Sequence, residues 1–235
     1  MKIEDIGFII FIKKFEENSL FIKVLSKENG IISGYIKHGK KQNQQIGNLV
    51  KFTWTARNSN NLGSLSIELI RSYSSHFMFN KLYLNLVNLM TNLINILLYE
   101  KIFENRLYDE FEIIINLIKN DSDKYLIIKE YFLFENILLN ILGTGLIFDN
   151  ATKLSDLHYI SPKTGLVVSK EKGDPYKEKL LLFPSLFKKN EVCKEDIIIC
   201  INTFNFFLKK YLNENIYLKK NNSILILIDK LSDNL

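Results

Sequence analysis

The spacing of the apolar residues changes near Tyr73, and this change constrains the fold more than any other feature of the chain. Before it, short segments rich in Ile, Phe, Val and Tyr alternate apolar and polar residues between turn residues, as half-buried strands do. After it, leucines recur every three or four residues, as on one face of a helix. We therefore expect an α+β protein with a β-module followed by helices.

Five segments of the first part read as strands: residues 7–15, 19–26, 30–37, 49–56 and 63–73. Five short strands are too few for two separate sheets, so they predict a five-stranded OB-fold β-barrel. An SH3-like barrel would show the same pattern. By alternation Phe52 and Trp54 share one face, which we expect to be the core, and Lys51 and Arg57 then point outward. Stacking on bases would fall to Tyr35 or Phe11.

The second part is expected to be an all-helical C-terminal domain. Helices are predicted from the leucine stripe at 82–97, at 106–119, at 124–142 with Asp123 as its cap, and at 195–212. Residues 143–189 look irregular, and residues 216–231 fit a helix or a strand, with a helix favoured. The expected domains are residues 1–75, an OB-fold nucleic-acid-binding domain, and residues 76–235, a helical domain with an irregular insertion at 143–190.

A stripe of amides argues against a membrane span at residues 82–99, which carry no charge. Asn85, Asn88, Asn92 and Asn95 recur at spacings of three and four, and burying each unpaired amide in lipid would cost roughly 2 to 7 kcal/mol. The N-terminal sequence MKIEDIGF contains acids, unlike a signal peptide. With two cysteines, Cys193 and Cys200, a cytoplasmic protein is expected.

The positive charge of the chain is concentrated in its first third. Residues 1–75 hold eleven Lys and Arg against six Asp and Glu, a net charge of +5, whereas residues 76–235 hold twenty of each sign. No acid lies between Glu28 and Glu68. A basic curved sheet predicts a polyanion as its partner.

The usual signatures of catalysis are missing. There is no nucleophile elbow, no His-Glu-x-x-His helix and no Gly-x-Gly-x-x-Gly turn. The segment 34–41 partly matches the sequence pattern of a phosphate-binding P-loop, through Gly34, Gly39 and Lys40. It lacks the Ser or Thr that binds magnesium, because Lys41 occupies that position. The three histidines show no metal-ligand spacing. We therefore expect a non-enzymatic protein without a cofactor or metal.

A family resemblance rests on motifs that follow one another over residues 5–190. They are GFII (7–10), SLFIKVL (19–25), KENG (27–30), KHGKK (37–41), GNLV (47–50), Trp54, Ala56, Arg57, Leu62, Gly63, Glu68, YFLFE (131–135), Leu138, Leu139, Leu142, Gly143, YISPKTG (159–165), DPY (174–176) and LLLFP (180–184). In this order they resemble the RecO family of bacterial DNA repair and recombination mediators, in its alphaproteobacterial branch.

The resemblance implies an OB fold followed by a helical domain. It further implies binding of single- and double-stranded DNA, annealing of complementary strands, and help in loading RecA onto coated single strands. The implied partners are RecR, the C-terminal tail of single-stranded DNA-binding protein and, indirectly, RecA. Many members carry four zinc-binding cysteines after the central helix, but residues 143–192 contain none here, so zinc is not expected.

The basic barrel and the resemblance together predict DNA binding on the barrel, by a nucleoid-associated chain that is a monomer alone. The predicted DNA-binding residues are Lys37, Lys40, Lys41, Lys51 and Arg57, with Lys13, Lys14, Lys23 and Arg71 in support. Two alternatives stay open: a helical protein-interaction adaptor with an OB docking module, and an RNA-binding OB protein. The sequence does not show where partner proteins dock.

Overall fold

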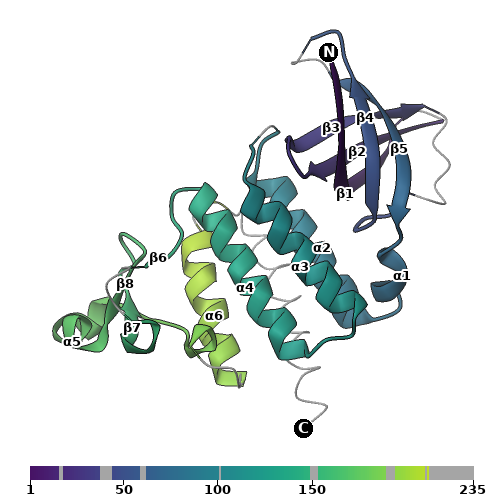
Figure 1. Ribbon diagram of the computed structural model, residues 1–235. Coiled ribbons are helices and arrows are strands. Elements are labelled where there is room, and N and C mark those ends of the chain that lie inside the picture. Colours follow the sequence, from purple (N-terminus) through teal and green to yellow (C-terminus); the bar gives the residue numbers. More distant parts are fainter. Residues whose placement is uncertain are drawn as a thin grey trace. The chain divides into compact units, whose positions relative to one another are not determined.

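A computed structural model describes residues 1–15, 18–37, 44–58, 62–100, 102–148, 153–188, 194–209 and 211 (Figure 1). Their contacts form two compact units, Met1–Asp121 and Ser122–Leu235. The first unit thus joins the β-module to the helices that follow it directly. The domain boundary expected at residue 75 stays a prediction, and the helix expected at 216–231 lies outside the described residues.

The first unit begins with a closed five-stranded barrel, so the structure has the predicted α+β class with an N-terminal barrel. Its strands are β1 (Lys2–Phe15), β2 (Ser19–Ser26), β3 (Gly30–Lys37), β4 (Leu49–Thr55) and β5 (Gly63–Arg71), in the order β1-β2-β3-β5-β4. The long β1 pairs with β4 through its first half and with β2 through its second half. This double pairing curves the sheet around its core.

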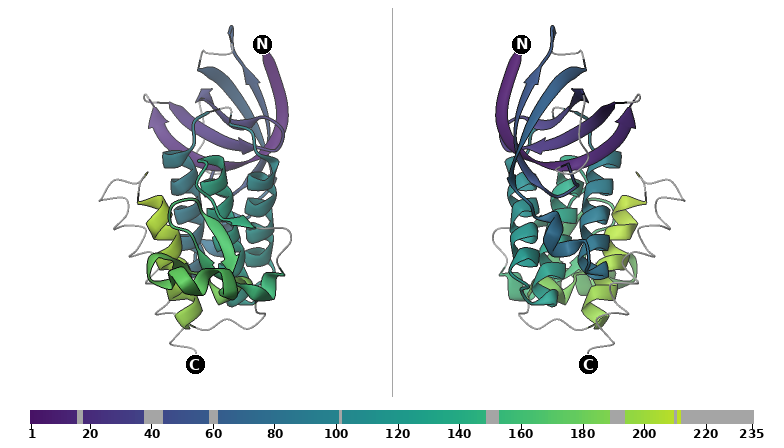
Figure 2. Two further views of the ribbon diagram at one scale, coloured as in Figure 1. Left: turned by 90° about the vertical axis from the view of Figure 1, so that its left-hand side faces the viewer. Right: turned by 90° about the vertical axis from the view of Figure 1, so that its right-hand side faces the viewer.

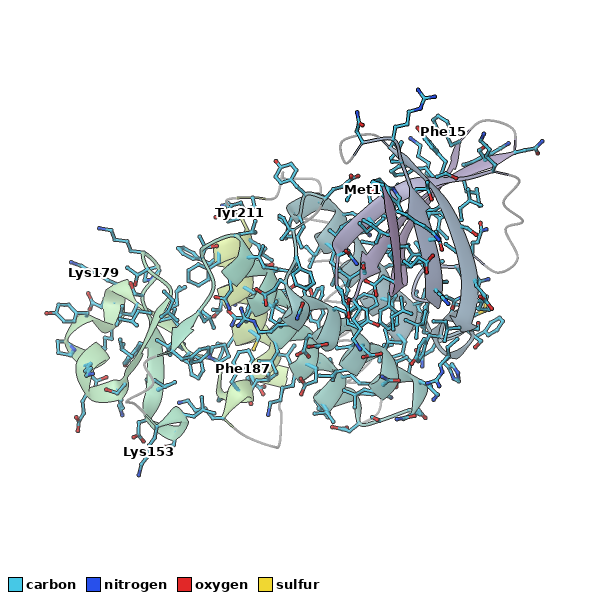
Figure 3. All side chains as sticks on the ribbon, turned by 45° about the horizontal axis from the view of Figure 1, so that its top comes forward. Met1, Phe15, Lys153, Lys179, Phe187 and Tyr211 are labelled. Carbon is cyan, nitrogen blue, oxygen red and sulfur yellow. The ribbon has the colours of Figure 1, made fainter. Side chains whose placement is uncertain are left out.

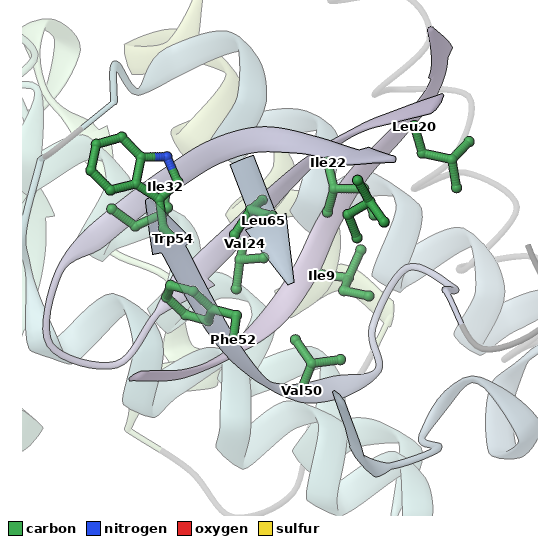
Figure 4. Packing of buried hydrophobic residues seen from close by; sticks show 10 residues of the cluster. Ile9, Leu20, Ile22, Val24, Ile32, Val50, Phe52, Trp54 and Leu65 are labelled. Atoms are coloured by element: carbon green, nitrogen blue, oxygen red, sulfur yellow. The ribbon is translucent and has the colours of Figure 1, made fainter. Parts of the chain in front are cut away.

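Alternating side chains of all five strands fill the barrel (Figure 4). Trp54 is only 5% exposed, and its indole N–H donates a hydrogen bond to the carbonyl oxygen of Ser33 at 2.9 Å. The prediction that Phe52 and Trp54 lie in the core, with Lys51 and Arg57 outside, is confirmed. The indole ring is therefore not available to stack on a base.

The barrel closes between β3 and β5 through two parallel residue pairs, Gly34 with Gly63 and Tyr35 with Ser64. A Cβ atom on Gly63 would lie 2.2 Å from Nε1 of Trp54, and one on Gly34 would lie 2.7 Å from the carbonyl oxygen of Gly63. Side chains cannot occupy such space. The two glycines are therefore what allows this short seam to form.

Three helices complete the first unit, and the barrel lies at one end of them (Figure 2): α1 (Ser74–Phe77), α2 (Lys81–Leu97) and α3 (Asn105–Lys119). Phe8 of β1 packs its ring against Tyr108 and Phe111 of α3, with centroids 5.4 and 5.1 Å apart. Asn95 of α2 donates a hydrogen bond to the carbonyl oxygen of Ile10 at 3.0 Å. Both longer helices are thus held against β1.

The second unit contains two long helices and a small sheet. α4 (Lys124–Ile141) is capped by the Asp123 carboxylate, which accepts from the Leu126 N–H at 3.2 Å, and the chain leaves it at Gly143 with φ +77. The remaining elements are β6 (Ile147–Phe148), η2 (Leu154–Asp156), β7 (Leu157–Ile160), β8 (Leu166–Ser169), α5 (Lys170–Gly173), η3 (Asp174–Lys179), β9 (Leu181–Leu182), η4 (Ser185–Phe187) and α6 (Lys194–Leu208).

The region expected to be irregular thus holds a four-stranded sheet of order β6-β8-β7-β9. Its strands are two to four residues long, too short for alternation to be visible in the sequence. None of the helices in the described residues is both long and apolar enough to cross a membrane.

Candidate nucleic-acid interface

The outer face of β1, β2 and β3 divides into a covered part and an open part. Phe8, Leu25 and Ile31 stand opposite one another across the three strands and are buried, with Phe8 under α3. Farther along the same strands the outward residues are partly or fully exposed, except Ser33, which is buried. The open part is therefore the surface that a ligand can reach on this side of the barrel.

Four aromatic rings form a continuous row on the open part. We call Phe11, Phe21, Tyr35 and Phe15 the aromatic row. Neighbouring ring centroids lie 6.1 Å apart for Phe11 and Phe21, 6.1 Å for Phe21 and Tyr35, and 4.6 Å for Tyr35 and Phe15. Phe15 marks the end of the row on the outside of the barrel (Figure 3) and is 41% exposed. Such rings can stack on unpaired bases.

Three predicted lysines stand among these rings. Lys13 lies opposite Phe21, Lys23 lies opposite Phe11, and Lys37 follows two residues after Tyr35. The ammonium group of Lys23 is 5.9 Å from the centroid of the Phe11 ring. None of the three forms an ion pair with another described residue. Their charges are thus free to meet phosphates beside the rings.

The other predicted cations lie elsewhere. Lys51 is on β4, opposite Glu68. The Glu4 carboxyl on neighbouring β1 has its pKa lowered, first by a hydrogen bond from Lys2 and in smaller part by the charge of Lys51. Lys51 thus has a carboxylate on each neighbouring strand, and it lies on β4 rather than on the strands of the aromatic row.

Arg71, Arg57 and Lys14 are also separate from the three lysines. The Arg71 guanidinium lies 5.6 Å from the Tyr73 ring centroid and donates to the Tyr73 hydroxyl at 3.3 Å, next to Asn116 of α3. Arg57 is exposed beyond the end of β4, and Lys14 is exposed on β1 between Lys13 and Phe15. Lys40 and Lys41 lie outside the described residues.

Two residues of the aromatic row were not among the predicted stacking candidates. Phe15 and Phe21 alternate with lysine or with core residues on β1 and β2. β2 has its predicted bounds, and β1 ends at Phe15 as predicted but begins at Lys2 rather than at residue 7. The sequence signal that could have identified them is an aromatic residue at an outward position on each of the adjacent strands. Tyr35 and Phe11, which the sequence left as alternatives, both belong to the row.

The residues between α4 and α6 do not fit the zinc site that the family resemblance suggests. Residues 143–192 contain no cysteine, and within the described residues no three His, Cys, Asp or Glu side chains gather as metal ligands. The sheet is held instead by packing: Phe183 contacts Phe148 and Phe187, with centroids 5.9 and 5.8 Å apart. The Tyr159 hydroxyl donates to Asp174 at 2.8 Å.

The remaining candidate groups are placed as follows. Cys200 is buried in α6, and burial raises the pKa of its thiol well above the usual value, with Glu135 and Asp196 adding to the shift. A buried thiol of this kind is a core residue rather than a nucleophile. Cys193 and His38 lie outside the described residues.

A small closed barrel that carries aromatic and basic residues on its outer face, followed by helices, defines a protein of the OB-fold class. A family model described as "Recombination protein O N terminal" matches residues 1–73. DNA repair protein RecO of Rickettsia canadensis (strain McKiel) is 35% identical over 223 residues, which cover 92% of this chain and 91% of the relative. DNA repair protein RecO of Rickettsia bellii (strain OSU 85-389) is 36% identical over 223 residues, with the same coverage.

The chain belongs to the RecO family of DNA repair and recombination proteins. The resemblance found in the sequence motifs is thereby confirmed. The matches extend over both units, since 92% of the chain is aligned.

Proposed function

We propose that this RecO-family chain binds single-stranded DNA on the open outer face of β1, β2 and β3. The aromatic row would stack unpaired bases, and Lys13, Lys23 and Lys37 would contact the backbone phosphates. The observation that carries the proposal is the continuity of the four rings, with centroid spacings of 4.6 to 6.1 Å, beside three lysines that form no ion pair with any residue the structure describes. This combination is what sequence-tolerant single-strand binding requires.

We further propose that the chain is a non-enzymatic mediator that anneals complementary strands. Two DNA strands repel each other, and a surface that neutralises phosphates lowers the free energy needed for them to meet. Duplex DNA would be bound through phosphates alone, because its bases are already stacked. RecR, the C-terminal tail of single-stranded DNA-binding protein and RecA are the proposed partners, with RecA loaded onto coated strands.

The decisive experiment measures the affinity for a labelled single-stranded oligonucleotide by fluorescence anisotropy. The variant Phe21→Ala/Tyr35→Ala should bind more weakly, because each lost stacking contact removes roughly 1 to 3 kcal/mol, or about 5- to 150-fold in affinity. Its affinity for duplex DNA should be nearly unchanged. Phe79→Ala is the matched control, since Phe79 is 90% exposed and distant in sequence from the row.

The salt dependence of the same measurement tests the lysines. Affinity falls as salt rises, so the slope of log affinity against log salt is negative. Replacing Lys13, Lys23 and Lys37 with Ala should reduce the magnitude of this slope by about 2, because each phosphate contact on a single strand contributes about 0.7. Lys51→Ala, which removes a lysine that faces Glu68, should change it less. An unchanged slope in the triple variant would remove these lysines from the interface.

Annealing and partner roles need a second assay. Wild-type protein should accelerate the annealing of complementary strands, both bare and coated with single-stranded DNA-binding protein, and the triple lysine variant should not. DNA affinity no better than that of any weakly basic protein would favour the adaptor alternative. Stronger competition by RNA than by DNA would favour the RNA-binding alternative.

A further inference from the structure

The outer side of α2 carries a line of amides, and Asn95 at its end bonds to the barrel. Asn85, Asn88, Asn92 and Asn95 follow one another at helical spacing, and we call them the amide stripe. Asn88 and Asn92 are exposed, while Asn85 and Asn95 are half-buried. Lys81, at the first residue of α2, extends the same spacing by one step and is exposed. From Lys81 to Asn95 the stripe runs about 21 Å along the helix axis.

The amide stripe begins at buried Ile10 of β1, next to the open part of the barrel's outer face. The Asn95 side-chain amide donates to the carbonyl oxygen of Ile10 at 3.0 Å and to that of Thr91 at 2.8 Å. Ile10 directly precedes Phe11, the first ring of the aromatic row. A ligand that lies on the row thus reaches the end of α2 without leaving the first unit.

Charge distinguishes α2 from α3, the other long helix at the barrel. The seventeen residues of α2 contain no acid, and Lys81 is their one charged residue. The first half of α3 contains Asp109, Glu110 and Glu112, and the one cation in that half, Arg106, is paired with Glu104. A polyanion leaving the barrel is therefore repelled by α3 and not by α2.

From this arrangement we infer that a single strand of DNA leaving the aromatic row continues along the amide stripe toward Lys81. The inference rests on the proposed binding of single-stranded DNA to the barrel. Amide groups both donate and accept hydrogen bonds, so Asn88 and Asn92 can bind phosphate oxygens or the edges of unpaired bases, and Lys81 meets a phosphate at the far end. The strand binding site is then longer than the barrel alone.

Oligonucleotide length provides the test. A strand of about 6 nucleotides fits within the site size of an OB fold, and one of about 20 nucleotides exceeds it. The variant Lys81→Ala/Asn88→Asp/Asn92→Asp should bind the long oligothymidylate about five- to tenfold more weakly than wild type, since it loses a cation and several hydrogen bonds. Its affinity for the short one should change less than twofold. The long-to-short affinity ratio is the quantity to compare.

Two controls separate a local contact from a general change of charge. Asn120→Asp, at an exposed position just after α3, adds a carboxylate to the same unit and should leave the affinity ratio as in wild type. Asn88→Ala/Asn92→Ala removes the two amides without adding charge and should still lower the ratio. Equal thermal stability of the variants excludes a folding defect.

The outcomes distinguish this inference from the proposal on which it rests. If Phe21→Ala/Tyr35→Ala weakens binding of both lengths but the α2 variants keep the wild-type ratio, the strand does not follow α2 while the barrel still binds it. If the aromatic variant binds both lengths as wild type does, the barrel proposal itself is wrong. A ratio lowered equally by Asn120→Asp would also overturn the inference.

Discussion

At the scale of single residues, Asp5 fixes the turn between β2 and β3. Its carboxylate accepts hydrogen bonds from the Ser26 hydroxyl, from the Glu28 N–H at 2.9 Å and from the Asn29 side-chain amide at 3.0 Å. It also accepts from the Ile6 N–H at 2.7 Å. Burial raises the pKa of Asp5, but these hydrogen bonds outweigh burial and hold the pKa below its usual value of 3.8.

The lowered pKa of Asp5 predicts a loss of stability in acid. The folded state binds the proton less readily than the unfolded state, so the ionised carboxylate stabilises the fold above the unfolded pKa of about 3.9. This contribution is lost as the pH falls through that value toward the lower folded pKa. We expect Asp5→Asn to be less stable than wild type at pH values above about 5, and to lose less free energy of unfolding on acidification.

Urea unfolding at a series of pH values measures this difference. Glu28→Gln is the matched control, because it removes a charge from the same turn while the Glu28 N–H still bonds to Asp5. If wild type and Asp5→Asn lost equal free energy between about pH 5 and pH 3, Asp5 would not be a source of the acid sensitivity.

Phe11 was a stacking candidate, but strict alternation of side chains could not predict that its ring points outward. Strict alternation would put Phe11 on the same face as Ile9, which lies in the barrel core. The pairing of β1 with β2 shifts between these residues, because Ile9 faces Val24 and Phe11 faces Lys23. Ile10 is thus the extra residue of a β-bulge, which turns Phe11 outward to join Phe21. A bulge leaves no mark in the apolar pattern.

At the scale of elements, the sequence located the long segments, although β1 begins at Lys2 rather than at residue 7 and α6 ends at Leu208 rather than at residue 212. It did not predict the short strands. The bounds of β2 and β3 agree with the sequence prediction, because five or more alternating residues give a clear local signal. Asp123 caps α4 as expected, because a capping residue is also a clear local signal. β6 and β9 have two residues each. Such strands are held by tertiary contacts: Phe148 packs on Phe183, Phe183 on Phe187, and Phe187 on Phe204 of α6.

The prediction at this scale concerns the small sheet between α4 and α6, which is held by side-chain packing rather than by a metal. Phe183 is 5% exposed and lies between the Phe148 and Phe187 rings, so Phe183→Ala should lower the free energy of unfolding of the second unit by about 3 to 5 kcal/mol. Hydrogen exchange at the β7 and β9 amides should accelerate. A chelator should leave the melting temperature and exchange of the wild type unchanged.

The neighbouring Leu182 provides the control for this variant. It is 50% exposed, so Leu182→Ala should cost far less than Phe183→Ala. Loss of β7 and β9 protection when a chelator is added to the wild type would contradict metal-free packing of the sheet.

At the scale of the whole molecule, the distribution of charge along the sequence predicted that nucleic acid binds to the barrel, but not which face of the barrel binds it. The net +5 of residues 1–75 is divided between the aromatic face, which carries Lys13, Lys23 and Lys37, and other surfaces, where Lys51 faces Glu68 and Arg71 lies on Tyr73. Counting charges along a sequence does not use strand register. The register decides which lysines share a surface.

Binding to the barrel should stabilise the first unit. A ligand that binds the folded state alone adds about 2.7 kcal/mol at a free concentration of about 100 times its Kd. We therefore expect a single-stranded oligonucleotide to slow hydrogen exchange in β1, β2 and β3, with less effect in the second unit. Heparin, which offers charge without bases, is the control. Equal protection by heparin would indicate binding by charge alone.

The seam of the barrel lies directly beside the proposed DNA surface. Two residue pairs join β3 to β5, and one of them contains Tyr35, whose ring belongs to the aromatic row. With so few hydrogen bonds between these strands, the free barrel should open there first when it fluctuates. A nucleobase stacked on Tyr35 would restrain β3 at that point. Bound nucleic acid would therefore keep the seam closed, and the closed seam would in turn keep Tyr35 in place for binding.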